Sequence, residues 1–427
     1  MTQDKLGGVL GALFVLFAIL MLIIERSPPI LAALCLLTAL ASVVRDASAR
    51  AHLRRIAAQP PVALVLAATA GLCLWMLVTT LWSVAGGEAA QRGARVVLMI
   101  AAATSLPLVA AALPAASARS AARGAAWTAG IAIVLLLIET LFGMPLLRGF
   151  RYLAHAEIYG ATPPQDPLPG ITYGEASILA NRLSHIAAVV AIMAGPLAAF
   201  MWRAGRPLAA AAVMAGAAAG LAGAATEAPF VALLSGVALA GIAFVPRWWG
   251  GVVAVAVAAV IVAMPLAAQR LAPVVLDLGL AGSDASVAHR LGIWANTAAL
   301  IAERPLPGYG MEASRVLGRQ GRTLDGLMPE SAVLFQSMPL HPHNAALQVW
   351  LELGAMGAMM FAALCGGLVW LATSVPAAPA ARAGALAALF SALMIAHVSF
   401  GIWQFWWIAA LGIAAACIVL IERGRNP

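Results

Sequence analysis

The chain of 427 residues has few charged residues, few cysteines and almost no lysine. Charged side chains make up 10% of it and hydrophobic side chains 63%, and the mean hydropathy is +0.95. Soluble domains carry about 25% charged residues, so this composition excludes an ordinary soluble enzyme. The four cysteines lie within apolar runs, which indicates buried packing residues and gives no disulfide framework.

Positive charge in this chain is almost wholly arginine. The net charge is +8, and Lys5 is the only lysine. Such a bias has two explanations that composition alone cannot separate. It reflects either genomic base composition or a need for planar guanidinium groups, which bind phosphate with two parallel hydrogen bonds.

Long apolar runs follow one another along the chain. A membrane-spanning helix needs roughly 20 mostly apolar residues, whereas a membrane barrel would need alternating strands that are absent here. We therefore predict an all-α, polytopic integral membrane protein. The breaks between runs predict about twelve spans, at 6–24, 28–44, 61–84, 96–114, 125–143, 178–202, 207–225, 229–245, 250–268, 355–374, 383–400 and 404–421.

Arginines in the short connections predict the orientation. If twelve spans alternate, one face receives Arg45, Arg50, Arg54, Arg55, Arg119, Arg123, Arg203, Arg206, Arg423 and Arg425. Short loops rich in Lys and Arg stay in the cytoplasm. We therefore expect residues 1–427 to form a single multi-pass domain of a bacterial inner membrane, with both termini cytoplasmic.

The opposite, periplasmic face receives the two longest segments between predicted spans. One is a loop at 144–177. The other is a large segment between the ninth and tenth spans, at 269–354, which ends in the sequence HPHNAALQVWLELG. Asn344, Gln348 and Glu352 recur there every four residues, which predicts one polar stripe on a helix that enters the bilayer. His343 would lie at the outer end of that stripe.

The spacing at this point resembles that of a known family. His343 and Asn344 are followed by nine residues, then Gly354, two residues and Gly357. This resembles the H-[NSQ]-x9-G-x-x-G pattern of lipopolysaccharide O-antigen ligases, whose superfamily includes O-antigen polymerases and bacterial protein O-oligosaccharyltransferases. Arg290, Trp294 and the turn Pro305-x-x-Gly-x-Gly resemble a further segment of that superfamily.

One departure from the family is visible in the sequence. Many relatives carry Ser-Arg-Gly near the start of the span at 229–245, whereas this chain reads TEAPF, with Pro229 where that arginine would be. The role of that arginine must therefore be absent here or be supplied by another residue, such as Arg182.

The resemblance implies a glycosyl transfer. An O-polysaccharide would leave undecaprenyl pyrophosphate while a sugar hydroxyl of the lipid A–core oligosaccharide attacks, with inversion at the reacting carbon. Histidine suits deprotonation of that hydroxyl near neutral pH. We assign this role to His343, with His341 as its neighbour or substitute. The alternative is that HPH merely begins a helix at a polar interface.

Arginines are expected to bind the departing pyrophosphate, since guanidinium groups stay charged. The candidates are Arg290, Arg182, Arg148 and Arg151, and Arg290 has the best support because it lies in the family-like segment. Arg182 could instead extend to the interface, and Arg148 and Arg151 could contact lipid headgroups or a phosphorylated core. Arg315, Arg319 and Arg322 are expected to be solvated loop charges.

No cofactor, metal or nucleic acid is expected. A His-x-His pair with a nearby acid can hold zinc, but the sequence shows no third ligand at a usual spacing, and the resembled family works without metal. The tryptophans in HVSFGIWQFWW favour an interfacial aromatic belt, with a role at the substrate entrance left open. The alternative functions are an O-antigen polymerase, then a protein O-oligosaccharyltransferase, then a transporter of lipid-linked sugars.

Overall fold

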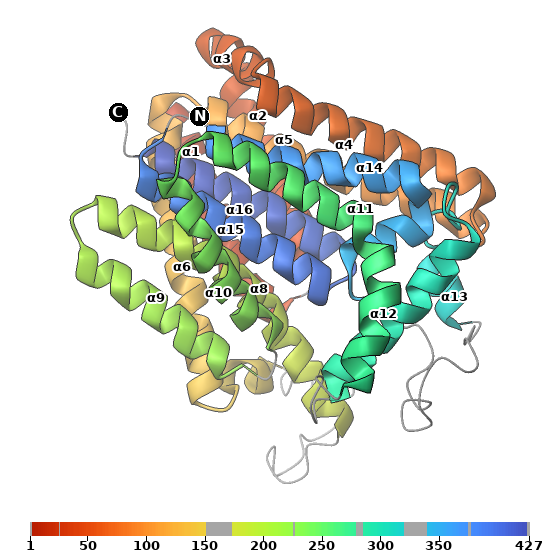
Figure 1. Cartoon of the computed structure of the whole chain (residues 1–427). Coiled ribbons are helices and arrows are strands. Elements are labelled where there is room, and N and C mark those ends of the chain that lie inside the picture. Colours follow the sequence, from red (N-terminus) through yellow and green to blue (C-terminus); the bar gives the residue numbers. More distant parts are fainter. Residues whose placement is uncertain are drawn as a thin grey trace, which may run out of the picture.

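The computed structural model describes residues 2–24, 26–150, 173–224, 227–278, 285–319, 340–374 and 377–424. Every regular element within these residues is a helix, which confirms the all-α prediction (Figure 1). The helices are α1 Gln3–Ile23, α2 Ser27–Val44, α3 Ala47–Ala57, α4 Pro60–Thr79, α5 Gly87–Ala112, α6 Ala115–Leu141, α8 Tyr173–Arg203, α9 Pro207–Ala222, α10 Ala228–Ala240, α11 Trp248–Asp277, α12 Ala285–Glu303, α13 Ala313–Arg319, α14 Ala345–Ser374, α15 Pro379–Val398 and α16 Phe405–Arg423, with 3-10 turns η1 Thr80–Trp82 and η2 Gly241–Phe244.

Apolar helices stand at all twelve predicted spans. Ten of the helices in the described residues are long and apolar enough to cross a membrane, and two shorter ones, Pro207–Ala222 and Ala228–Phe244, occupy the seventh and eighth positions. The predicted breaks between helices near Pro229 and near Gly401 are both present. Proline in the first turn begins α2, α4, α9, α10 and α15, where its missing N–H leaves no helical bond unmade.

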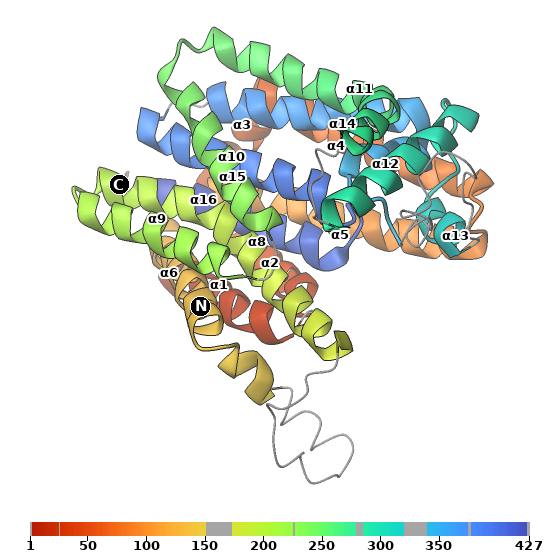
Figure 2. The ribbon, with the colours of Figure 1, turned by 60° about the horizontal axis from the view of Figure 1, so that its bottom comes forward.

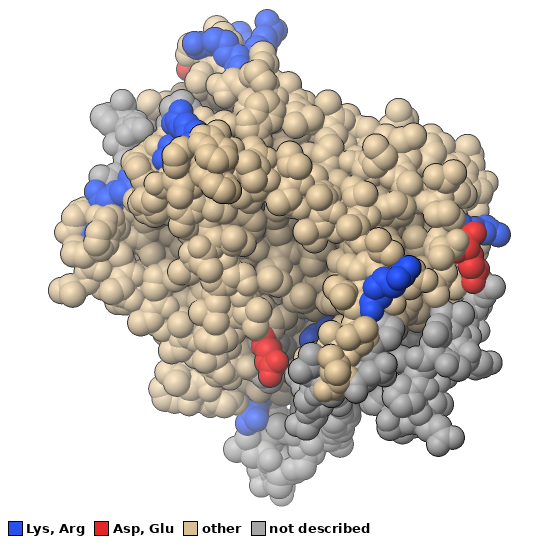
Figure 3. Space-filling model, viewed as in Figure 1, with Lys and Arg blue, Asp and Glu red and all other residues tan. Residues whose placement is uncertain are grey.

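The outer surface fits a lipid environment. Large apolar side chains such as Leu81, Leu98 and Val255 are exposed, at 83%, 71% and 70%. Figure 3 shows a broad uncharged surface between charged groups at opposite ends of the molecule. A continuous exposed apolar surface of this kind marks contact with a membrane.

Close helix contacts hold the interior together. The tightest joins α1 and α6, where a Cβ on Gly124 would lie 2.3 Å from the Cα of Gly11, and one on Gly7 would lie 2.3 Å from the carbonyl oxygen of Ser117. Small residues allow helices to approach closely where no hydrophobic effect drives them together. Figure 2 shows a second group of helices, α4, α11 and α14, beside the group that contains α1 and α6.

Both ends of the described chain lie at one end of the bundle (Figure 1). There Ser42 Oγ donates to Gln3 Oε1 at 2.6 Å, Ser117 Oγ donates to the Gln3 carbonyl at 2.7 Å, and Arg203 pairs with Glu422. The arginine-rich connections gather at this end, as the alternation predicted. Arg119 and Arg123 lie within α6, not in a loop, because α6 begins ten residues before the predicted span.

The described parts of the two segments predicted to lie outside the membrane are at the other end. Residues 145–150 are helical, and the rest of the first segment to residue 172 lies outside the described residues. In the second segment, α11 continues to Asp277 and α14 already begins at Ala345. A non-helical residue, Gly354, divides α14 at the point where the tenth span was predicted to begin.

Candidate active site

The divided helix α14 explains the glycines of the sequence motif. Gly354 has φ +64°, and a Cβ there would lie 2.0 Å from the carbonyl oxygen of Leu306. Backbone in this left-handed region favours glycine. Gly357 is equally confined, because its Cβ would lie 2.2 Å from that of Leu353 across the kink. Only glycine fits both positions.

A kink in a helix frees backbone groups that must find other partners. The turn at residues 305–310 and one tryptophan provide them. The N–H groups of Tyr309 and Gly310 donate to the carbonyls of Leu351 and Glu352, each at 2.8 Å, and Ala355 N donates to Pro305 O at 2.9 Å. Trp75 Nε1 donates to Leu353 O at 2.8 Å. The Pro-x-x-Gly-x-Gly turn is therefore the structural partner of the kink.

The polar stripe lies on one buried face of α14, as predicted. Asn344 is the N-terminal cap of the helix, since its Oδ1 accepts from Leu347 N at 3.0 Å. Gln348 accepts from Ile402 N at 3.0 Å and donates to Glu352 at 3.2 Å. The stripe thus attaches the connection between α15 and α16 to α14.

Glu352 is the most connected residue of the stripe. Its carboxylate accepts hydrogen bonds from Glu312 N at 2.8 Å, Ser314 Oγ at 2.5 Å and Trp403 Nε1 at 3.0 Å. It contacts neither histidine of the HPH sequence in these bonds. Its place in the structure is to join α14 to two loops that border the site.

The two histidines lie directly before the cap. His343 has φ +52°, and its Nδ1 lies 2.5 Å from Ser399 O. A carbonyl can only accept, so Nδ1 carries the hydrogen and Nε2 keeps the lone pair in the neutral ring. Trp294 Nε1 donates to the carbonyl of Pro342 at 3.0 Å, which fixes the same turn from α12.

Burial makes both histidines weak bases. It lowers the pKa of His343 below its ordinary 6.5; the Ser399 hydrogen bond opposes this shift, and the charges of Arg290 and His289 add to it. Burial, with smaller contributions from His343 and Arg315, lowers the pKa of His341 to about 3. Both rings are therefore neutral at pH 7, the state a general base requires.

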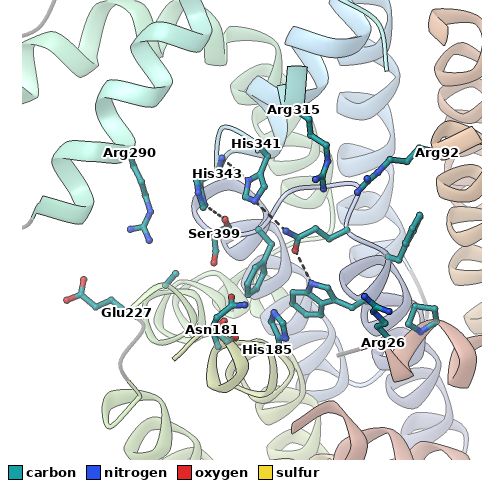
Figure 4. A pocket seen from close by; sticks show the side chains of 17 residues that line it. Arg26, Arg92, Asn181, His185, Glu227, Arg290, Arg315, His341, His343 and Ser399 are labelled. Atoms are coloured by element: carbon teal, nitrogen blue, oxygen red, sulfur yellow. Dashed lines mark hydrogen bonds between the residues drawn. The ribbon is translucent and has the colours of Figure 1, made fainter. Parts of the chain in front are cut away.

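A cavity of about 830 Å³ opens beside these histidines (Figure 4). This volume falls within the roughly 300–1,000 Å³ of typical small-molecule sites. Its lining is strongly basic, and the charged or titratable side chains in it are Arg26, Arg92, Arg290, Arg315, His185, His341, His343 and Glu227. Within the described residues, Arg290 makes no hydrogen bond or ion pair, so its guanidinium is available to an anion.

The structure brings together only some of the predicted site residues. His341, His343 and Arg290 line the cavity, and Trp294 supports it. Arg182 on α8 and Arg148 on the helical residues after α6 do not line it. Arg151 lies outside the described residues.

Two predictions are corrected here. Arg315 is not a solvated loop charge, since it lines the cavity and pairs with Glu312. Trp403, Trp406 and Trp407 do not form an interfacial belt, because they are 5%, 6% and 0% exposed. They are packed inside the protein, where Trp403 Nε1 donates to Glu352 Oε2 at 3.0 Å and Trp406 Nε1 donates to Gln404 Oε1 at 2.9 Å.

Sequence reasoning missed several residues that line the cavity. They are Arg26, which precedes α2, Arg92 on α5, and Asn181 and His185 on α8. His185 is 2% exposed, and its ring centroid lies 4.0 Å from that of Trp406. All four stand at span ends on the face of the HPH sequence, and this shared placement was the signal that could have found them.

Among the described residues there is no group of three or more His, Cys, Asp or Glu side chains placed to hold a metal ion. The His341–His343 pair, with ring centroids 4.3 Å apart, thus lacks a third ligand within that part of the chain. The class defined by fold and site is a polytopic membrane protein with a basic, histidine-containing cavity at one end of its helix bundle.

Comparison with known proteins agrees with this class. Residues 210–362 match a family described as O-antigen ligase. Over 146 residues the chain is 30% identical to a candidate polysaccharide ligase of Rickettsia felis and 31% identical to one of Rickettsia conorii. These matches cover 34% of this chain and 35% and 34% of the relatives, so the chain spans about a third of the length of the curated relatives it matches. Over residues 210–362 these matches support the family that the sequence resembles, that of the O-antigen ligases.

Proposed function

We propose that this protein transfers a polysaccharide from undecaprenyl pyrophosphate to a sugar hydroxyl of the lipid A–core oligosaccharide. The reaction would take place at the periplasmic face of a bacterial inner membrane, within lipopolysaccharide biosynthesis. The observation that carries the proposal is the tautomer of His343, whose Nδ1 is held by Ser399 O and whose Nε2 is left to accept a proton beside a basic cavity.

In the proposed reaction His343 Nε2 takes the proton of the attacking hydroxyl. The hydroxyl oxygen bonds to the reducing-end carbon as the bond from that carbon to the pyrophosphate oxygen breaks. Arg290 stabilises the negative charge that develops on the pyrophosphate, in the way that fixed cations stabilise a leaving group. A single displacement inverts the configuration of that carbon. The proposal includes neither a metal nor a cofactor.

The test is transfer by the purified full chain in detergent, supplied with lipid-linked O-antigen, lipid A–core acceptor and excess EDTA. Wild type is compared with His343→Ala and, as a matched control at the opposite end of the bundle, His52→Ala. The proposal expects a ladder of acceptor-linked product from wild type and His52→Ala, and a loss of roughly 10²–10⁴-fold for His343→Ala.

Three outcomes would contradict it. Lengthening of glycan on undecaprenyl pyrophosphate with the acceptor untouched would make the protein a polymerase. Wild-type transfer that EDTA abolishes would require a metal. Normal transfer by a folded His343→Ala protein would leave the histidine turn with a structural role only.

A further inference from the structure

The cavity has one wall whose lining includes no lysine, arginine or carboxylate. Helix α8 contributes Asn181, Ser184 and His185 to it, and the chain from Ser399 to Trp406 contributes the rest. Figure 4 shows Asn181 and His185 on a different side of the cavity from the histidine pair of the HPH sequence. This wall, which we call the α8 wall, is therefore separate from the proposed base.

Aromatic packing fixes the imidazole ring of His185. Its centroid lies 4.0 Å from that of Trp406 at an interplanar angle of 34°, and 5.7 Å from that of Phe400 at 61°. The indole of Trp406 is held in turn, because its Nε1 donates to Gln404 Oε1 at 2.9 Å. The ring is thus oriented by its faces and edges, without use of its nitrogens.

The hydrogen-bonding capacity of His185 is not used up by the protein. The residue is 2% exposed, and its Nδ1 is buried without a hydrogen-bond partner in the part of the chain that the structure describes. Buried polar atoms in proteins nearly always have a partner, since leaving one unpaired is unfavourable. Because His185 lines the cavity, a ligand there is the natural partner of its ring.

Asn181 extends this hydrogen-bonding surface by one helical turn. It is exposed and lies four residues before His185 on α8, which places both side chains on one face about 6 Å apart along the axis. Ser184 Oγ donates to the backbone carbonyl of Asn181 at 2.6 Å, a bond that does not involve the side-chain amide. That amide offers two donors and an acceptor.

The chemistry of the α8 wall fits a sugar better than an anion. A sugar ring has hydroxyl groups around its edge and C–H groups on its faces, so it is bound by uncharged donors and acceptors beside apolar carbon. Asn181 and His185 supply the first, and the rings of Phe400 and Trp406 supply the second. The two side chains are spaced so that a single sugar ring can bridge them.

We propose that Asn181 and His185 form a subsite that binds the hydroxyl or acetamido groups of an uncharged sugar ring next to the reacting carbon. This inference rests on the proposed function. The sugar belongs either to the donor glycan or to the acceptor oligosaccharide, and the experiment distinguishes these two sources.

The test measures initial rates while donor and acceptor concentrations are varied separately. His185→Phe keeps the aromatic contact with Trp406 and removes both ring nitrogens, and Asn181→Leu removes the amide at similar size. Each should raise the KM for the same one of the two substrates by about threefold to tenfold, the effect of losing one hydrogen bond between uncharged groups. The other KM should stay within about twofold.

His397→Phe is the matched control. His397 on α15 also has a buried ring nitrogen without a partner in the described residues, Nε2, but it does not line the cavity and its Nδ1 donates to Leu393 O at 2.7 Å. This variant should leave both KM values unchanged. His185→Gln, which keeps a donor and an acceptor, should give an intermediate KM and serves if His185→Phe does not fold.

Free glycans identify the source of the sugar. Core oligosaccharide released from lipid A, and O-polysaccharide released from its carrier, are each added as inhibitors of transfer. His185→Phe and Asn181→Leu should weaken inhibition by the glycan of the substrate whose KM they raise, and leave inhibition by the other glycan unchanged. The ratio of variant to wild-type KM should be the same at low and high salt, since salt screens charges and not hydrogen bonds between uncharged groups.

The inference is overturned if neither KM rises, if both rise equally, or if His397→Phe has the same effect as His185→Phe. It is also overturned if the KM ratio falls at high salt, because the wall would then bind a charged group. Absence of any acceptor-linked product from wild type would defeat the proposed function itself, which distinguishes the two failures.

Discussion

The two ends of the helix bundle use arginine differently. At the end that carries the termini, three arginines are bound within the protein: Arg203 pairs with Glu422, Arg423 donates to Ala110 O at 3.0 Å and Arg382 to Ala243 O at 2.8 Å. At the cavity end, Arg290 makes no such contact within the described residues, and Arg92 and Arg315 share one carboxylate. The paired arginines anchor one end of the bundle, while at the other end Arg290 is left to bind a ligand.

Backbone conformation differs in the same way. The three non-glycine residues with positive φ in the described part, Met144, Glu312 and His343, all lie at the cavity end. The other end is built from regular helices joined by short turns. The site therefore depends on local strain, which the surrounding contacts must maintain.

The largest expected effect comes from removing the kink. In Gly354→Ala the added Cβ would both strain the backbone and lie 2.0 Å from Leu306 O; each of these costs about 1–3 kcal/mol. We expect a large fall in the thermal unfolding temperature in detergent and little transfer activity. Gly130→Ala, where nothing lies within 4 Å of the new Cβ, is the control and should unfold as wild type does.

The next effect contrasts arginines at the two ends. Arg290→Gln should lower the transfer rate by roughly 10²–10³-fold, the usual loss when one fixed donor to a developing charge is removed. Arg203→Gln, which breaks the ion pair at the other end, should change the rate less than twofold. Equal losses in the two variants would show that the ends do not differ in function.

The sequence predicted the membrane-spanning helices better than it predicted the contacts around the cavity. Hydropathy gives the spans because a helix in lipid must satisfy its own backbone and expose apolar side chains, and period-four spacing gave the polar stripe of α14. The ion pairs of Arg92 and Arg315 with Glu312 could not be predicted, since they join α5 to α13 at a residue with positive φ. The tryptophans after Gly401 were misplaced because a buried indole and an interfacial one have the same pattern in sequence.

A smaller effect is expected in the pH dependence of transfer. Because burial holds the pKa of His343 below 6.5, the base stays neutral until the pH falls below that value. The acid limb of the wild-type profile should therefore lie below pH 6.5. In Arg290→Gln a charge that disfavours protonation is removed, so the limb should move to higher pH. If the limb stays in place, the charge of Arg290 does not act on the pKa of His343, or His343 is not the group that titrates.

The smallest effect concerns the support of the histidine turn. Trp294→Phe keeps the packing of α12 but removes the hydrogen bond to Pro342 O at 3.0 Å, which is worth about 0.5–1.5 kcal/mol. Transfer should fall by roughly twofold to tenfold, because His343 Nε2 is then held less firmly toward the attacking hydroxyl. Trp127→Phe removes an indole that is 67% exposed on α6 and should leave the rate unchanged. A Trp294→Phe protein with the full wild-type rate would mean that Asn344 and Ser399 suffice to fix the turn, and that the α12 contact serves only to place Arg290.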